Sequence, residues 1–138
     1  MKILITGING QVGSDLVKQA RDKKHEVVGV SRKHWDMSKH PEKGEQVVLK
    51  TMPDLVINSA AYTDVNRAED DEQTAFDVNC QAPRAMAIAC RKLDIPLFHI
   101  STDYVFNGHK RNPYTESDEP CPINAYGRSK LALSLIHI

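Results

Sequence analysis

Two patterns of apolar and polar residues alternate along this 138-residue chain. Short runs rich in Val, Ile and Leu, followed by Gly, Asn or Ser, are typical of buried strands. Longer segments in which apolar residues recur every three or four positions are typical of one face of a helix. The runs predict strands at residues 2–7, 25–32 and 53–62, and a fourth strand with its outgoing loop over residues 95–106. The helical spacing predicts helices over residues 11–23 and 72–93, and a last helix that follows Asn124.

Local signals refine these elements. The long helix contains Pro83, which predicts a kink or a restart near Asn79 because proline removes a backbone donor. Residues 107–122 hold three prolines and several acids, so we expect a long loop there. Asn124 has the side chain of a helix N-cap. Residues 38–50 are polar and lysine-rich, and they predict a surface connection with some helix.

Strands alternating with helices at this spacing are typical of a parallel sheet covered by helices on both faces. The predicted fold class is α/β: a Rossmann-type doubly wound parallel sheet, truncated before its last strands and the substrate domain. We expect one incomplete domain over residues 1–132 and a separate tail over residues 133–138.

Composition narrows the classes of partner. Lys and Arg together number 18, as do Asp and Glu, so no net field favours nucleic acid or an anionic membrane. No apolar stretch approaches the roughly 20 residues of a membrane span. The three cysteines are isolated and the six histidines have no ligand spacing, which predicts neither disulfides nor a metal site. These features favour a reduced, cytoplasmic setting.

Three glycines lie between the first strand and the first helix, in "TGINGQVG": Gly7, Gly10 and Gly13. Glycine permits a tight turn, lets backbone N–H groups approach a phosphate, and packs the helix close to the sheet. The helix N-terminus favours the negative charge of a pyrophosphate. In this position the turn predicts dinucleotide binding rather than a merely structural bend.

The end of the second strand bears on the type of cofactor. An acidic residue there would bind the ribose 2′-hydroxyl of NAD, whereas arginine accommodates the 2′-phosphate of NADP. This chain has Ser31 and Arg32, and its next carboxylate is Asp36. Both NADP(H) and NAD(H) stay open, and the arginine favours NADP(H).

The last predicted helix carries Tyr126 and Lys130, four residues apart and therefore on one face. An ammonium group beside a tyrosine lowers its pKa from about 10, which makes the phenol a usable general acid or base. Ser101 and Thr102, after the fourth predicted strand, supply hydroxyls that could hold a carbonyl oxygen beside the tyrosine.

Taken with the glycine turn, the segments "NSAAYTDV", "FDVN", "ISTDYVFNG" and "PYTESDEPCPINAYGRSKLA" resemble the extended short-chain dehydrogenase/reductase superfamily. Within it, the chain is most similar to the dTDP-4-dehydrorhamnose reductase family. The resemblance implies NAD(P)H-dependent reduction of the 4-keto group of a dTDP-6-deoxyhexose, with a homodimer as one assembly open to the intact protein. It implies a catalytic triad of Thr102, Tyr126 and Lys130.

The resemblance also implies which residues hold the cofactor. They are Gly7, Gly10, Gln11, Val12, Gly13, Ser31, Arg32, Asp36, Met37, Ala60, Ala61, Tyr62 and Lys130. We expect Trp35 to cover a surface near the adenine, and His99 to be a strand residue with one hydrogen-bonded ring nitrogen.

Two other functions share these features. One is a sugar-nucleotide epimerase or dehydratase of the same superfamily; "STDYVFNG" followed by "PYTESD" favours the reductase. The other is a non-catalytic, NADP-binding regulatory subunit of the methionine adenosyltransferase type, against which Thr102 in place of serine argues mildly.

The last residues depart from the family, whose members continue for about as many residues again. After "YGRSKLA" relatives proceed with a glycine and a glutamate, whereas residues 133–138 read "LSLIHI". That tail resembles the in-frame translation of a transposase-end adapter used for sequencing libraries, so we expect it to be non-native. An open sheet edge predicts that this polypeptide alone is poorly soluble and inactive, and the function is assigned to the intact parent.

Overall fold

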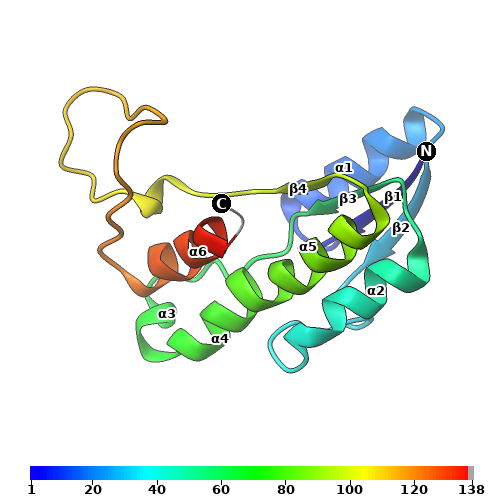
Figure 1. Ribbon diagram of the computed structural model, residues 1–138, viewed down its shortest axis with the longest axis horizontal. Coiled ribbons are helices and arrows are strands. Elements are labelled where there is room, and N and C mark those ends of the chain that lie inside the picture. Colours follow the sequence, from blue (N-terminus) through cyan, green and yellow to red (C-terminus); the bar gives the residue numbers. More distant parts are fainter. Residues whose placement is uncertain (137–138) are drawn as a thin grey trace.

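A parallel sheet of four strands forms the centre of the chain in the computed structural model, which describes residues 1–136 (Figure 1). The strands are β1 (Lys2–Thr6), β2 (Glu26–Val30), β3 (Leu55–Asn58) and β4 (Leu97–His99). Their order in the sheet is β2-β1-β3-β4, and each neighbouring pair is parallel. The predicted Rossmann-type architecture is confirmed.

Helices cover both faces of the sheet (Figure 1). Helix α1 (Gln11–Asp22) packs on one face, where Ile3, Ile5 and Ala20 form a buried cluster. Helices α2 (Gly44–Thr51) and α5 (Ala82–Leu93) pack on the other, in the larger cluster. Its buried members are Leu4, Val30, Trp35, Met37, Val48, Val56, Ala82, Met86, Ala89 and Cys90.

The structure confirms the helix predicted within residues 38–50, but this segment is not only a surface connection. Most of it folds as the short 3₁₀ helix η1 (Pro41–Lys43) and helix α2, and the Val48 side chain is fully buried. Gly44 allows this packing, because a Cβ there would lie 2.8 Å from the carbonyl oxygen of Ala82 on α5. Close approach of two helices therefore decides the structure of a segment whose own sequence is polar.

The predicted long helix is one continuous run of different helical types. It begins with α4 (Glu72–Phe76), passes through the π-helical segment η2 (Asp77–Gln81) and continues as α5. Pro83 lies in the first turn of α5, where its missing N–H is tolerated. The acidic residue Asp71 caps the beginning of α4, where its side chain accepts a hydrogen bond from the Thr74 N–H.

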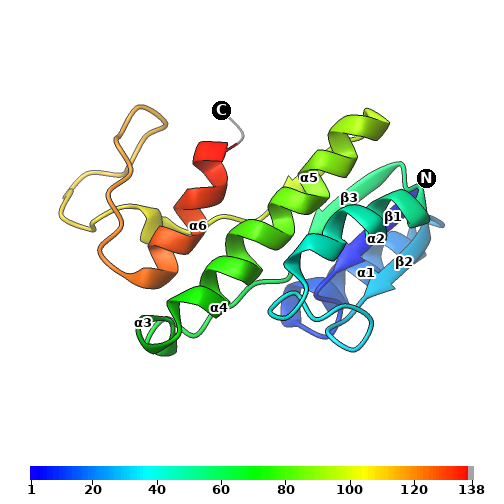
Figure 2. The same cartoon turned by 60° about the horizontal axis from the view of Figure 1, so that its bottom comes forward.

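Helix α6 (Ala125–Ile136) lies beside α4 and η2 and contacts the short helix α3 (Arg67–Asp70) (Figure 2). Asn124 caps it as predicted, since its Oδ1 accepts a hydrogen bond from the Gly127 N–H at 2.7 Å. Residues 95–106 contain the predicted fourth strand and its outgoing segment. The strand ends at His99, and the 3₁₀ helix η3 (Asp103–Val105) follows before the long loop.

The predicted non-native tail begins inside α6. Leu133 is buried, whereas residues 137–138 lie outside the described residues, so the origin of the tail stays a prediction. None of the helices within residues 1–136 is both long enough and apolar enough to cross a bilayer.

Candidate functional site

The glycine turn between β1 and α1 is too closely packed for other residues. Gly7 has a φ of +72°, and a Cβ there would lie 2.7 Å from the Ala60 nitrogen. A Cβ on Gly13 would collide with the Gly7 carbonyl oxygen. The Gly10 N–H donates to that same oxygen at 2.9 Å, which closes the turn just before α1 begins. This is the close backbone approach by which a strand-to-helix turn can hold a phosphate.

A cavity of about 320 Å³ opens beside this turn, at the carboxyl ends of β1, β2 and β3. It brings together many of the predicted cofactor residues. These are Gly7, Gly10, Ser31, Arg32, Asp36, Met37, Ala60, Ala61 and Tyr62. Gln11, Val12, Gly13, Thr102, Tyr126 and Lys130 are predicted site residues that do not line it.

Sequence reasoning missed several residues that line the cavity. They are Asn9, Val30, Ser38, Ser59, Thr74 and Val78. Most are direct sequence neighbours of residues that were predicted. Thr74 and Val78 come from α4 and η2, and no local pattern indicates that these helices reach the cavity.

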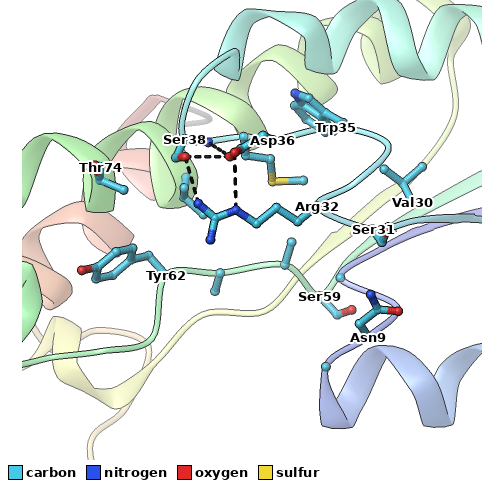
Figure 3. Close-up of a pocket in the computed structure, with 16 residues that line it drawn as sticks. Asn9, Val30, Ser31, Arg32, Trp35, Asp36, Ser38, Ser59, Tyr62 and Thr74 are labelled. Carbon is cyan, nitrogen blue, oxygen red and sulfur yellow. Dashed lines mark hydrogen bonds and ion pairs between the residues drawn. The ribbon is translucent and has the colours of Figure 1, made fainter.

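Arg32 extends over the cavity toward Asp36 and Ser38 (Figure 3). Its Nε lies 3.4 Å from Asp36 Oδ2, and its terminal nitrogen lies 3.5 Å from Ser38 Oγ. Hydrogen bonds from Ser38, followed by the charge of Arg32, lower the pKa of Asp36. The side chain of Arg32 is 79% exposed, so much of its charge stays available to an anion.

Trp35 is not a surface cover, contrary to the prediction. Its ring is 5% exposed and belongs to the core beneath the cavity, and its Nε1–H donates to the His40 carbonyl at 2.8 Å. Satisfying the indole N–H with a backbone oxygen allows so large a ring to be buried. Trp35 therefore shapes the cavity from below.

The loop after β3 is held by Asn79, which is fully buried in η2. Its Oδ1 accepts from the Tyr62 N–H at 2.9 Å, and its Nδ2 donates to the Tyr62 carbonyl at 3.0 Å. The same Nδ2 lies 2.9 Å from Ser129 Oγ on α6. Asn79 thus joins the cavity wall to the helix that carries the predicted catalytic pair.

Lys130 is 3% exposed and lies between α6 and the end of β4. Its Nζ donates to the Ile100 carbonyl at 2.6 Å and lies 3.3 Å from His99 Nε2. Burial lowers the pKa of Lys130 to about 8. His99 has partners on both ring nitrogens, rather than the one expected, since its Nδ1 lies 2.9 Å from Asn58 Nδ2.

Thr102 and Tyr126 also lie where α6 meets the segment that follows β4. Residues 100–104 run beside α6, with Lys130 bonded to Ile100 and the Tyr126 ring packed edge-on against Tyr104, centroids 5.6 Å apart. Thr102 comes between these two contacts, and its Oγ1 accepts from the Tyr104 N–H at 3.3 Å. Among the described residues, no hydrogen bond joins Thr102, Tyr126 and Lys130 to one another.

Metal-binding chemistry has no support in the part of the chain that the structure describes. No group of three or more His, Cys, Asp or Glu side chains is placed there to hold an ion. Cys80 and Cys90 are buried and Cys121 is exposed, and all three are free thiols. Burial raises the pKa of Cys90 to about 11, which makes it a poor nucleophile.

Comparison with known proteins adds family evidence to this geometry. The model of the family described as RmlD substrate binding domain matches residues 1–134. The chain belongs to this family. A similar curated protein is the dTDP-4-dehydrorhamnose reductase of Burkholderia thailandensis, which is 45% identical over 131 residues. The match covers 95% of this chain and 43% of that protein, so the chain spans less than half the length of this RmlD-family relative.

Solved structures of RmlD-family relatives have the same fold. A dTDP-4-dehydrorhamnose reductase from Clostridium acetobutylicum matches with a TM-score of 0.91 and 37% identity, over 98% of this chain and 48% of that one. The reductase from Bacillus anthracis, solved in complex with NADP, matches with a TM-score of 0.89 and 35% identity, over 97% and 48% of the two chains. The chain is thus related to NAD(P)-dependent reductases of the short-chain dehydrogenase/reductase type.

Proposed function

We propose that this chain is the cofactor-binding part of an NAD(P)H-dependent reductase that reduces the 4-keto group of a dTDP-6-deoxyhexose. The observation that carries the proposal is the close-packed glycine turn beside the cavity, in a chain that belongs to the RmlD family. Relatives continue for about as much chain again, so the proposal concerns a polypeptide that supplies that region as well.

The residues present fit a dinucleotide. The space that a Cβ would fill at Gly7 and Gly13 is taken by neighbouring atoms, mostly of the backbone, so only glycine fits at these two positions of the turn. The N-terminus of α1 follows at once and favours a pyrophosphate. Ser31, Arg32 and Asp36 lie where an adenosine ribose would follow, and the exposed guanidinium suits a 2′-phosphate. This cation, together with the NADP bound to the Bacillus anthracis relative, supports a preference for NADP(H).

The second cluster would carry the proton chemistry. When bound, a reduced nicotinamide supplies a hydride to the carbonyl carbon. The Tyr126 phenol would donate a proton to the resulting alkoxide, and the Thr102 hydroxyl would hold the carbonyl oxygen. Lys130 would hold the nicotinamide ribose and, when it carries its proton, stabilise the negative charge that Tyr126 develops on giving up its proton.

A direct assay tests this function. The polypeptide extended by the region that relatives have should oxidise NADPH when dTDP-4-dehydrorhamnose is added, and Tyr126→Phe should lower kcat by about 10²-fold or more. Tyr114→Phe is the matched control, because its hydroxyl bonds within the long loop, to Asn107 Oδ1 at 3.1 Å. Unchanged turnover in Tyr126→Phe would contradict the assigned role. NADPH binding without any turnover would favour the regulatory module instead.

A further inference from the structure

A largely buried chain of hydrogen bonds crosses the carboxyl ends of three strands and ends at Lys130. The Thr6 hydroxyl on β1 lies 2.5 Å from Asn58 Oδ1 on β3. Asn58 Nδ2 lies 2.9 Å from His99 Nδ1 on β4, and His99 Nε2 lies 3.3 Å from Lys130 Nζ on α6. Thr6, Asn58 and Lys130 are each 3% exposed or less, and His99 is half-buried. The buried polar atoms of this chain of hydrogen bonds must each meet a donor or an acceptor.

One backbone group fixes the direction of this chain. The Ala60 N–H can only donate, and it lies 3.2 Å from the Asn58 side-chain atom that also faces Thr6. That atom is therefore the amide oxygen, and the Asn58 NH₂ group faces His99. Because an NH₂ group only donates, His99 Nδ1 must accept. A neutral imidazole that accepts at Nδ1 carries its proton on Nε2.

The His99 Nε2–H consequently faces Lys130. An ammonium group has only donors, whereas a neutral amine has a lone pair that can accept. The Ile100 carbonyl accepts from Lys130 in either form. We propose that Asn58 and His99 are positioning residues that present to Lys130 an N–H donor that only the neutral amine of Lys130 can accept.

The surroundings of Lys130 also favour its neutral amine over its ammonium form. Burial already lowers the pKa of Lys130 to about 8, and a facing donor disfavours the ammonium form further. The carboxylates that α3 and α4 bring to α6 are Glu69 and Glu72, and both pair with Arg128. Among the described residues, no carboxylate contacts Lys130 to offset this effect.

This inference rests on the proposed function for the role of Lys130. It adds that Asn58 on β3 and His99 on β4 influence whether Lys130 carries a proton. At mildly alkaline pH Lys130 would be divided between two forms. Its ammonium can stabilise negative charge that develops on Tyr126, and its amine can take up a proton. The proton states of His99 and Lys130 can be measured without cofactor or substrate, so the inference can be tested even if the assigned reaction is wrong.

The first test reads the tautomer of His99 and the titration of Lys130 by NMR, in cofactor-free protein with labelled histidine and lysine. The expected result is a proton on His99 Nε2 and a Lys130 Nζ that titrates at or below about 8, against 10.5 for an ordinary lysine. A proton on Nδ1, or an ordinary lysine titration, would overturn the proposal. This measurement needs no variant and no reductase activity.

The second test reverses the direction of donors and acceptors along the hydrogen bonds that lead to Lys130. In Asn58→Asp, a carboxylate oxygen would accept from His99 Nδ1–H and leave Nε2 to accept from an ammonium. The Lys130 pKa should rise by more than about one unit, a tenfold change in its protonation equilibrium. Thr6→Val is the matched control: it removes a hydroxyl from the chain but leaves the Ala60 N–H to orient Asn58, so the Lys130 pKa should not move.

A double-mutant cycle separates transmission through His99 from the added negative charge. If the imidazole transmits the reversal, Asn58→Asp should raise the Lys130 pKa by less than half as much in a His99→Leu background. An equal rise in both backgrounds would mean that charge alone acts, and would overturn the assignment of His99 as a positioning residue.

Discussion

Lys130 Nζ and the Ile100 carbonyl oxygen are joined by a 2.6 Å hydrogen bond that ties helix α6 to the end of strand β4. Helix α6 otherwise packs mainly on α4, η2 and η3, which lie beyond the carboxyl edge of the sheet. A buried lysine therefore anchors the helix that carries Tyr126 to the sheet that would carry the cofactor. The contribution of Lys130 to the free energy of unfolding therefore depends on pH.

The stability of the fold should rise between pH 8 and 10.5 because of Lys130. Its pKa is lowered from 10.5 to about 8 in the folded chain, so the unfolded state binds more protons in that interval and stability increases with pH. The full difference is about 3 kcal/mol, at 1.36 kcal/mol for each pKa unit. Urea unfolding at pH 7 and pH 10 measures it.

Lys130→Met should remove this pH dependence, because the variant has no ammonium to bury. The wild type minus Lys130→Met difference isolates the lysine from other groups that titrate in the same range. Lys92→Met is the control, since Lys92 is exposed and bonds Glu45 at the surface. An identical pH profile in wild type and Lys130→Met would contradict the prediction.

Gly13→Ala should abolish dinucleotide binding and destabilise the chain. Its Cβ would collide with the Gly7 carbonyl oxygen and come within 2.8 Å of Ser59 Oγ, so the turn must move. Isothermal titration with NADPH, together with urea unfolding, reports both effects. Ser14→Ala is the control one residue further along α1, where an exposed hydroxyl donates only to the Gln11 carbonyl; its affinity for NADPH should stay near that of the wild type.

Local patterns predicted β1, α1 and the glycine turn because adjacent residues determine them: an apolar strand, an amphipathic helix and glycines between them. Some helix was predicted over residues 38–50, but the burial of α2 was missed, because Val48 is buried only through packing on other elements. The chain of hydrogen bonds that ends at Lys130 was missed for the same reason. Its links join residues 52, 41 and 31 positions apart, and no window of sequence contains such pairs. Contacts between residues so far apart in the sequence form only when the parallel strands lie side by side.

Arg32 should govern the choice between NADPH and NADH. Arg32→Ala is expected to weaken NADPH binding by about tenfold or more and to leave NADH nearly unaffected, since a charged hydrogen bond to a phosphate is worth about 1.5–3 kcal/mol. Lys33→Ala is the matched control, because Lys33 is exposed and does not line the cavity. Equal losses for the two dinucleotides would show that Arg32 does not contact a 2′-phosphate.

The open edge of β4 should promote self-association. Strand β4 is the last in the described order, and Phe98 on it is 64% exposed. Unpaired strand edges with exposed apolar side chains favour edge-to-edge pairing, and lysine opposes it. Phe98→Lys should therefore raise the monomer fraction of this chain in analytical ultracentrifugation. Ile123→Lys, at a position that is 67% exposed in the loop, is the control and should change it little. An equal gain from both variants would indicate a general effect of charge.

Asn79→Leu should be among the most destabilising single substitutions in the chain. Leucine has a similar size, but it would leave the Tyr62 N–H and carbonyl and the Ser129 hydroxyl without their Asn79 partner in a buried place. Each orphaned group costs about 1–3 kcal/mol, so a loss of about 3 kcal/mol or more in the free energy of unfolding is expected. Gln73→Leu is the control, because Gln73 makes its hydrogen bond to Asp77 at the surface of the same helical run. A loss below about 1 kcal/mol in Asn79→Leu would mean that water replaces the lost bonds, and that Asn79 does not hold the cavity wall to α6.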